Sequence, residues 1–329
     1  MRRVVLAGPY DLRLEEGPAP RAEPGQVVVR VEAAGVCGSD LHGYRGVNER
    51  RRPGTVMGHE VSGTVEEVGT AVDAHWRGQG VVINPVLGCG SCEACRHAEP
   101  QRCPDKTLIG CTPTHPGGFA DLLSVPVTAL VPWPGPAPLA WGAFAEPLAV
   151  GLHAVDRVAV PKRNVLVIGS GAVGIAAALA AGRAGGTVTI TEGDERRSPL
   201  LRHLGLLPRD PASVAAAAPF DVVVDCVAGA DSLALGLDHL RIGGTTVVVG
   251  LGAPRAEVSV ERLVQRDLIV RGSAQYSRAS FGAAVAWLSS GQLDISGLLA
   301  RQPLSQTSRL FRSWHDDSSR PVRTLLYPD

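Results

Sequence analysis

Four cysteines lie close together in the run GCGSCEACRHAEPQRC, at positions Cys89, Cys92, Cys95 and Cys103. Thiolates spaced C-x2-C-x2-C-x7-C can converge on one tetrahedral soft cation, as in a structural zinc site. An iron–sulfur cluster is the alternative, since the first three cysteines are spaced as in a ferredoxin. In that motif, however, the last gap is three residues and a second cysteine set holds a second cluster. This sequence has a gap of seven and no second set, which favours structural zinc.

A glycine-rich turn, Gly169-Ser170-Gly171-Ala172-Val173-Gly174, is the second chemical signal. It follows the apolar run NVLVIG and precedes an alanine-rich helical segment, the context in which GxGxxG binds a dinucleotide. The first glycine permits a tight turn, the second lets backbone approach a pyrophosphate, and the third lets helix pack on strand. A doubly wound domain that binds no nucleotide is the alternative. The context favours the dinucleotide.

An acidic residue, Glu192, ends the next apolar run, TVTIT. This is where such domains place the acid that binds the ribose hydroxyls. Its negative charge would repel a 2′-phosphate, so NAD is expected in preference to NADP. Arg196 and Arg197 follow closely, and either could pair with that phosphate, which leaves NADP as the alternative.

A third set of chemically capable residues lies near the start of the chain and in its middle. It comprises GVCGSDLH with Cys37, Ser39, Asp40 and His42, then His59 and Glu60 in GHE, and much later Glu146. Each alone is unremarkable, because a single cysteine or histidine is usually structural. The order of all three signals along one chain is what carries information.

The elements that must position these residues lie in two regions with different sequence patterns. From Gln26 to about Leu130, short apolar runs are broken by glycine and proline, which indicates an antiparallel, barrel-like domain. From about Pro161, apolar strands alternate with helical segments, which indicates a parallel sheet with crossover helices. The predicted strands there are 164–169, 187–191, 221–227, 245–250 and 267–273, followed by a helix over 281–290 and a closing strand over 322–327.

Composition excludes several classes of function. The chain has 329 residues, enough for two domains, and equal numbers of basic and acidic residues, 32 each. Because no global charge favours an anionic partner, neither nucleic acid nor a membrane surface is expected to bind. The first apolar stretch is too short for a secretory signal or a membrane span. A cytoplasmic, reducing location is therefore expected, where clustered cysteines are metal ligands rather than disulfides. Cys111 and Cys226 are expected to be buried, small apolar residues.

The chain resembles the zinc-containing medium-chain dehydrogenase/reductase, or alcohol dehydrogenase, family over nearly its whole length. The resemblance rests on GVCGSDLH, GHE, the cysteine quartet, GGFA at 117–120, AEPLAVGLHAV at 145–155 and GSGAVG at 169–174. It is closer to polyol and threonine dehydrogenases than to ethanol-type enzymes. It implies a GroES-like β-barrel catalytic domain over 1–145, completed by 275–329, and a Rossmann doubly wound NAD-binding domain over 146–274. The active site is then expected in the cleft between the two domains.

The resemblance also implies roles for individual residues. Cys37 and His59 would hold a catalytic zinc ion, with Glu60, Glu146 or a bridging water completing the set. Asp40 would orient His59, while Ser39 would take the substrate proton and His42 would pass it to solvent. One zinc would thus be catalytic and one structural, with Gly169, Gly171, Ala172, Val173, Gly174, Glu192 and Arg197 at the nucleotide.

The function implied is hydride transfer between a secondary alcohol (a polyol, sugar or aminocyclitol) and NAD, in a homodimer or homotetramer. One alternative is a threonine or simple-alcohol dehydrogenase with the same machinery. Another is a non-catalytic NAD- and zinc-binding regulator of the same fold. Three consecutive arginines, 50–52, precede GHE. They are expected in a solvated loop, or alternatively to receive an acidic or phosphorylated substrate.

Overall fold

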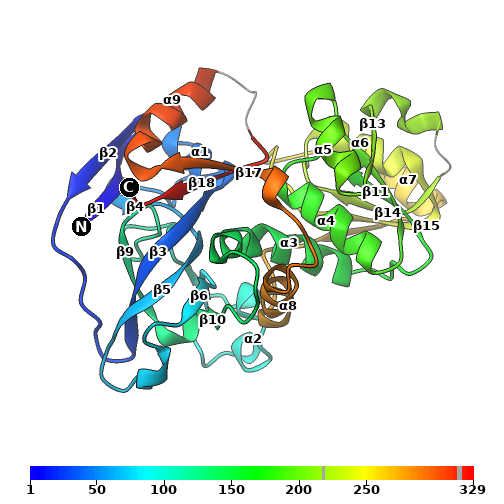
Figure 1. Cartoon of the computed structure of the whole chain (residues 1–329). Helices are drawn as coiled ribbons and strands as arrows, with labels where there is room; N and C mark the ends of the chain where they lie inside the picture. The colour runs from blue at the N-terminus through cyan, green and yellow to red at the C-terminus, as the bar shows by residue number, and fades with distance from the viewer. Residues whose placement is uncertain (217–218, 317–320) are drawn as a thin grey trace. The chain divides into compact units, whose positions relative to one another are not determined.

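The computed structural model describes residues 1–216, 219–316 and 321–329 (Figure 1). The chain forms two compact units, Met1–Glu146 together with Phe281–Asp329, and Pro147–Ser280. Within the described residues, no helix combines the length and the apolar character needed to cross a bilayer.

The first unit is built on a largely antiparallel sheet of seven strands. Its order is β10 (Leu130–Pro132), β6 (Gly80–Ile83), β5 (Glu60–Val68), β3 (Gln26–Val36), β18 (Arg323–Tyr327) and β17 (Leu299–Pro303), with β9 (Leu122–Pro126) also paired to β3. A second sheet joins β2 (Asp11–Glu16), β1 (Arg2–Gly8) and β4 (Thr55–Val56), and β7 (Val86–Leu87) pairs with β8 (Thr107–Leu108). The helices are α1 (Gly38–Tyr44), α2 (Glu93–Arg96), most of α8 (Arg278–Ser289) and α9 (Thr307–Asp316).

Strand β3 organises this unit. Its valines alternate with more exposed residues over part of its length, so that Val27, Val29 and Val31 enter a core shared with Met57 and Phe119. The last strand, β18, lies antiparallel beside the end of β3, although the two are about as far apart in sequence as the chain allows (Figure 1). The end of β3, where Cys37 follows, therefore lies between β5 and β18.

The second unit is a parallel sheet with helices connecting its strands. The strand order is β13 (Leu207–Arg209), β12 (Thr187–Thr191), β11 (Asn164–Ile168), β14 (Phe220–Asp225), β15 (Leu240–Val248) and β16 (Ile269–Gly272). Its helices are most of α3 (Ala145–Asp156), then α4 (Ala172–Arg183), α5 (Ser198–His203), α6 (Ala230–His239) and α7 (Val260–Gln265). This is the doubly wound order of a dinucleotide-binding domain, so the predicted Rossmann fold is confirmed.

The five strands predicted for this unit are confirmed, β12 with its predicted bounds and the other four with shifted ends. Strand β15 begins at Leu240, five residues before the predicted start, because the glycines of RIGG do not interrupt the strand. The sixth strand, β13, was missed. It has three residues with a central proline and lies at the sheet edge, so it shows no alternation that a pattern could reveal.

Candidate metal centres and cofactor site

The four cysteines of the loop come together in the first unit. Their sulfur atoms all lie within 4.8 Å of one another. Cys92 caps helix α2, and its backbone N–H donates to Cys89 Sγ at 3.4 Å. A side chain on Gly88 would place its Cβ 2.4 Å from Cys95 Sγ, so this glycine is needed for the sulfur to fit. Backbone N–H groups, that of Ser91 first, lower the pKa of Cys89 to about 6. Four converging sulfurs, one already inclined to ionise, fit a structural zinc ion.

A second group of possible ligands joins Cys37, His59 and Glu60, again with ligand atoms within 4.8 Å of one another. Strand pairing produces it, because Gly35 of β3 lies opposite Glu60 of β5. A Cβ on Gly35 would fall 2.2 Å from Glu60 Oε2, so the glycine makes room for the carboxylate. Gly58 has φ +97° and contacts Phe119, which sets the turn that presents His59. The motifs GVC and GHE thus use their glycines to bring three ligands to one point.

The charges around this group favour the thiolate form of Cys37. Burial opposes ionisation of Cys37, but hydrogen bonding with His59 and the charges of His59 and Arg323 outweigh it and lower the pKa of Cys37 to about 5. Burial raises the pKa of Glu60 well above its usual value, although Arg323 Nη1 lies 3.2 Å from Oε1. Among the described residues, neither oxygen of Glu60 has a hydrogen-bond partner. A buried carboxyl group whose oxygens accept no hydrogen bond, beside a thiolate and an imidazole, is suited to binding a cation. A sulfur, a nitrogen and an oxygen ligand together suit zinc.

Asp40 lies behind His59, as expected of a residue that orients it. Its Oδ1 is 3.6 Å from His59 Nδ1, and its Oδ2 accepts the backbone N–H of Cys37 at 2.9 Å. Burial opposes ionisation of Asp40, but the charges of Arg51 and His59 outweigh it and hold its pKa at about 2. The carboxylate is therefore ionised and tied to both the sulfur and the imidazole ligand.

The remaining residues proposed for this site occupy three different settings. Ser39 is half-buried in α1, and His42 is exposed on the same helix. Glu146 does not belong to the group of converging ligand atoms found among the described residues. Its charge nevertheless acts on Glu60 and contributes to that carboxyl's raised pKa.

Two buried arginines were not anticipated. Arg50 and Arg52 are exposed as expected, but the prediction of a solvated loop is wrong for Arg51, whose side chain is 3% exposed. Arg323 is also buried and donates to the carbonyl of Val36 at 2.5 Å. No motif or regular spacing in the sequence marks either arginine as buried. The clue that was available is chemical, because buried carboxylates such as Asp40 require cationic partners.

The glycine-rich turn of the second unit opens helix α4. Gly169 has φ +92°, and a Cβ on Gly174 would lie 1.9 Å from the carbonyl oxygen of Gly169. At Gly171 an added Cβ meets nothing within 4 Å, so the backbone there is open to a ligand. Ala172 and Val173 begin α4, whose N-terminus suits a pyrophosphate. The three glycines thus occupy the three steric situations that a dinucleotide-binding turn requires.

Glu192 follows β12, whose last residue, Thr191, accepts the backbone N–H of Gly169 at 2.9 Å. Glu192 Oε1 accepts the backbone N–H of Asp194 at 2.6 Å. Its Oε2 lies 3.6 Å from Arg197 and has no hydrogen-bond partner within the described chain. A buried carboxylate oxygen without a donor fits the hydroxyls of a ribose.

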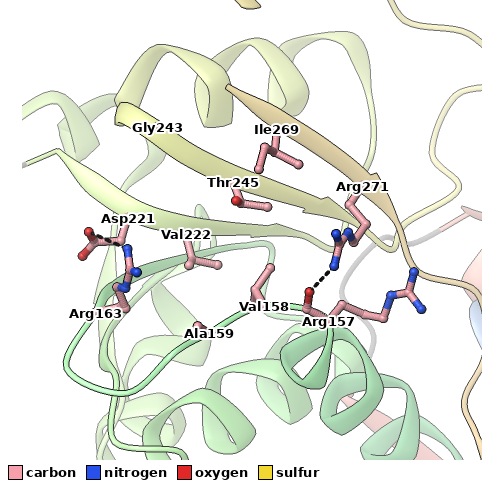
Figure 2. A pocket seen from close by; sticks show the side chains of 10 residues that line it. All are labelled: Arg157, Val158, Ala159, Arg163, Asp221, Val222, Gly243, Thr245, Ile269 and Arg271. Carbon is pink, nitrogen blue, oxygen red and sulfur yellow. Dashed lines mark hydrogen bonds and ion pairs between the residues drawn. The ribbon is translucent and has the colours of Figure 1, made fainter. Parts of the chain in front are cut away.

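A hollow of roughly 200 Å³ opens at the other end of the same sheet (Figure 2). It is lined by the starts of β14 and β16, by Gly243 and Thr245 of β15, by Arg163 directly before β11, and by the segment after α3. Arg271 donates across it to the carbonyl of Arg157, and Asp221 faces Arg163. Open α/β sheets bind their ligands at the carboxyl ends of the strands, so this hollow is not the cofactor site.

Comparison with known proteins agrees with these two sites. The alcohol dehydrogenase GroES-like domain matches residues 23–135, and the zinc-binding dehydrogenase family matches residues 172–290. L-idonate 5-dehydrogenase of Vitis vinifera and sorbitol dehydrogenase of Arabidopsis thaliana are each 30% identical, over 90% of this chain and 86% of theirs. A Sinorhizobium meliloti 1021 structure, assigned as a zinc-binding dehydrogenase bound to NADP, has a TM-score of 0.90 at 27% identity and covers 99% of both chains.

These findings define a zinc-binding, nucleotide-dependent oxidoreductase with a GroES-like and a Rossmann domain. The chain belongs to the zinc-containing alcohol dehydrogenase family, in its polyol dehydrogenase branch. The resemblance seen in the sequence is confirmed, as are the enzyme class and the expectation of zinc and a pyridine nucleotide as cofactors.

Proposed function

We propose that the enzyme oxidises a secondary alcohol of a polyol or sugar acid to a ketone, with NAD as the preferred acceptor. The observation that carries this proposal is the convergence of Cys37, His59 and Glu60 in the same chain as the glycine-rich turn. Relatives named for L-idonate and sorbitol support a hydroxyl-rich substrate. Threonine and simple alcohols are the competing substrates, since the same metal site would serve them.

Cys37, His59 and Glu60 would hold the catalytic zinc, with Glu146 or a water as a further ligand. A zinc ion in such a site acts as a Lewis acid and lowers the pKa of an alcohol. Asp40 keeps the imidazole of His59 in the orientation that ligation needs. Ser39 would receive the proton that the alcohol loses, and the exposed His42 would release it to solvent.

NAD is preferred in this proposal because Glu192, directly after β12, has an oxygen without a hydrogen-bond partner among the described residues. A 2′-phosphate would meet that carboxylate, and Arg197, the nearby cation, is already within 3.6 Å of it. When bound, the nucleotide supplies the hydride-accepting ring.

A substrate panel tests these proposals together. Polyols, L-idonate, aminocyclitols, threonine and simple alcohols would each be offered with NAD and with NADP, and reduced nucleotide would be followed by absorbance. We expect the highest kcat/KM with a polyol or sugar acid and NAD. Higher kcat/KM with threonine, or with NADP, would replace the corresponding part of the proposal.

We also propose that the enzyme is a cytoplasmic homodimer or homotetramer. A reducing compartment is the setting in which a thiolate quartet keeps its metal. Strand β16 lies at the edge of its sheet and exposes Ile269 and Val270, and an exposed apolar edge strand is suited to pairing with another copy. Light scattering tests the assembly, and a monomer at micromolar concentration would contradict it.

A further inference from the structure

Arg51 is the one buried member of three consecutive arginines. Its Nη2 lies 2.9 Å from Asp40 Oδ1, 3.0 Å from Ser39 Oγ and 3.4 Å from His59 Nδ1. A single nitrogen therefore touches the carboxylate behind the imidazole ligand, the hydroxyl proposed to carry the proton, and the imidazole itself. With a side chain 3% exposed, Arg51 has no surface left for an acidic substrate.

The contacts of Asp40 show what this nitrogen does. Asp40 Oδ2 is fixed by the N–H of Cys37, and Oδ1 is fixed by Arg51, so the carboxylate is held at both ends. Oδ1 is also the atom that faces His59 Nδ1, at 3.6 Å. Without Arg51 nothing in this set of contacts would hold Oδ1 in place, and the carboxylate could turn about the bond that Oδ2 accepts from Cys37. Asp40 would then no longer orient His59.

Helix α1 makes space for this arginine. A Cβ added to Gly43 would lie 2.2 Å from Cδ of Arg51, 2.9 Å from its Cβ and 3.1 Å from its Cγ. All three nearest atoms belong to Arg51, so the glycine serves this one side chain. Alanine is otherwise the better helix former, which makes a glycine inside α1 an independent sign that the position of Arg51 matters.

We propose that Arg51 is a positioning residue of the catalytic centre, an inference that rests on the metal site assigned under the proposed function. It locks Asp40 and the Ser39 hydroxyl into one arrangement and thereby sets zinc affinity and proton transfer. The positive charge of Arg51 by itself opposes cation binding, whereas its positioning of Asp40 favours it. A rise in zinc affinity on removing Arg51 would show that the charge dominates and would overturn the proposal.

The test uses the full chain loaded with zinc and titrated with a chelator. The variants are Arg51→Met, Gly43→Ala, the double variant and Arg51→Lys, with the exposed neighbour Arg52→Met as the matched control. We expect zinc affinity at the Cys37 site to fall 10- to 100-fold in Arg51→Met and Gly43→Ala, the usual effect of losing an outer partner of a ligand. Zinc in the cysteine quartet is the internal reference and should be retained throughout.

Two further readouts separate positioning from a merely structural role. With cobalt in place of zinc, the absorption bands of the Cys37 site should change in Arg51→Met and stay unchanged in Arg52→Met. In the zinc enzyme, kcat should fall in Arg51→Met while KM for the alcohol stays nearly constant. Arg51→Lys keeps the charge on a shorter side chain, so its cobalt bands and its kcat should lie between those of wild type and Arg51→Met.

The double variant makes the argument specific. If Gly43→Ala acts only by displacing Arg51, the double variant should lose no more zinc affinity than Arg51→Met alone. Additive losses, or wild-type zinc affinity and cobalt bands in Arg51→Met, overturn the proposal. Should Arg51→Met not fold, wild-type affinity in both Gly43→Ala and Arg51→Lys overturns it equally. A wild-type enzyme that retains only one zinc contradicts the proposed metal site instead.

Discussion

Arg323 Nη1 lies 3.2 Å from Glu60 Oε1, and neither side chain is more than 5% exposed. The two residues come from β18 and β5, on either side of β3, so the last strand supplies the charge that faces a proposed zinc ligand. The first unit therefore needs the end of the chain for electrostatics as well as for sheet pairing.

Replacing Arg323 by methionine should be destabilising. It would remove the donor to the carbonyl of Val36 and the cation that faces Glu60. Because burial already raises the pKa of Glu60 well above its usual value, the carboxyl left behind can take up a proton, and the expected loss is that of buried polar groups without partners, about 1–3 kcal/mol. Urea unfolding of the metal-free protein measures this without interference from zinc. Arg323→Met combined with Glu60→Gln should recover part of the loss, because the buried amide of glutamine does not have to take up a proton. A loss below about 1 kcal/mol, the range of exposed pairs, would contradict the burial argument.

Cys37→Ala should abolish turnover while nucleotide binding is little changed. The variant removes the thiolate of the proposed catalytic zinc, and Lewis-acid stabilisation supplies several kcal/mol of the rate acceleration. A fall in kcat/KM of roughly a thousandfold or more is expected. Turnover and NADH fluorescence titration would be compared with Cys226→Ala, which lies in the other unit. An enzyme with full activity after Cys37→Ala does not use this site.

Cys95→Ser should damage stability first and activity second. Zinc content should fall from two ions to one per chain, and the unfolding free energy by roughly 4 kcal/mol, as loss of a bound metal typically causes. Cys226→Ser is the control, because that thiol lies outside both ligand groups found among the described residues. If Cys95→Ser keeps two zinc ions and its full stability, the quartet is not a structural zinc site.

The sequence predicted those parts of the site in which spacing carries the chemistry. The quartet around Cys95 and the turn at Gly171 are local, so their residue types and intervals suffice. Arg51 could not be separated from Arg50 and Arg52, because its burial depends on contacts with other elements, such as Gly43 and Asp40 of α1. Arg323 was missed for the same reason. Its role depends on β18 lying beside β3, which is a property of the topology rather than of any local pattern.

The last prediction concerns pH and the acidic residue at the hollow in the second unit (Figure 2). Asp221 accepts the backbone N–H of Asn164 at 2.7 Å and pairs with Arg241 and Arg163. Burial opposes ionisation of Asp221, but these three partners outweigh it and lower its pKa below the ordinary value. A lowered pKa means that the folded state binds its proton less tightly than the unfolded state. The stability that Asp221 contributes is therefore complete above the unfolded pKa of about 4 and is lost as pH falls through the lower folded pKa.

Asp221→Asn should accordingly cost about 1 kcal/mol or less at pH 7, since its partners are partly exposed to solvent. The difference from wild type should shrink as pH falls below about 4, because the wild-type carboxyl is then neutral too. Urea unfolding at a series of pH values measures it, with the exposed Glu257→Gln of the same unit as control. A difference that stays constant from pH 7 down to pH 3 would show that Asp221 acts through packing or hydrogen bonding rather than through its charge.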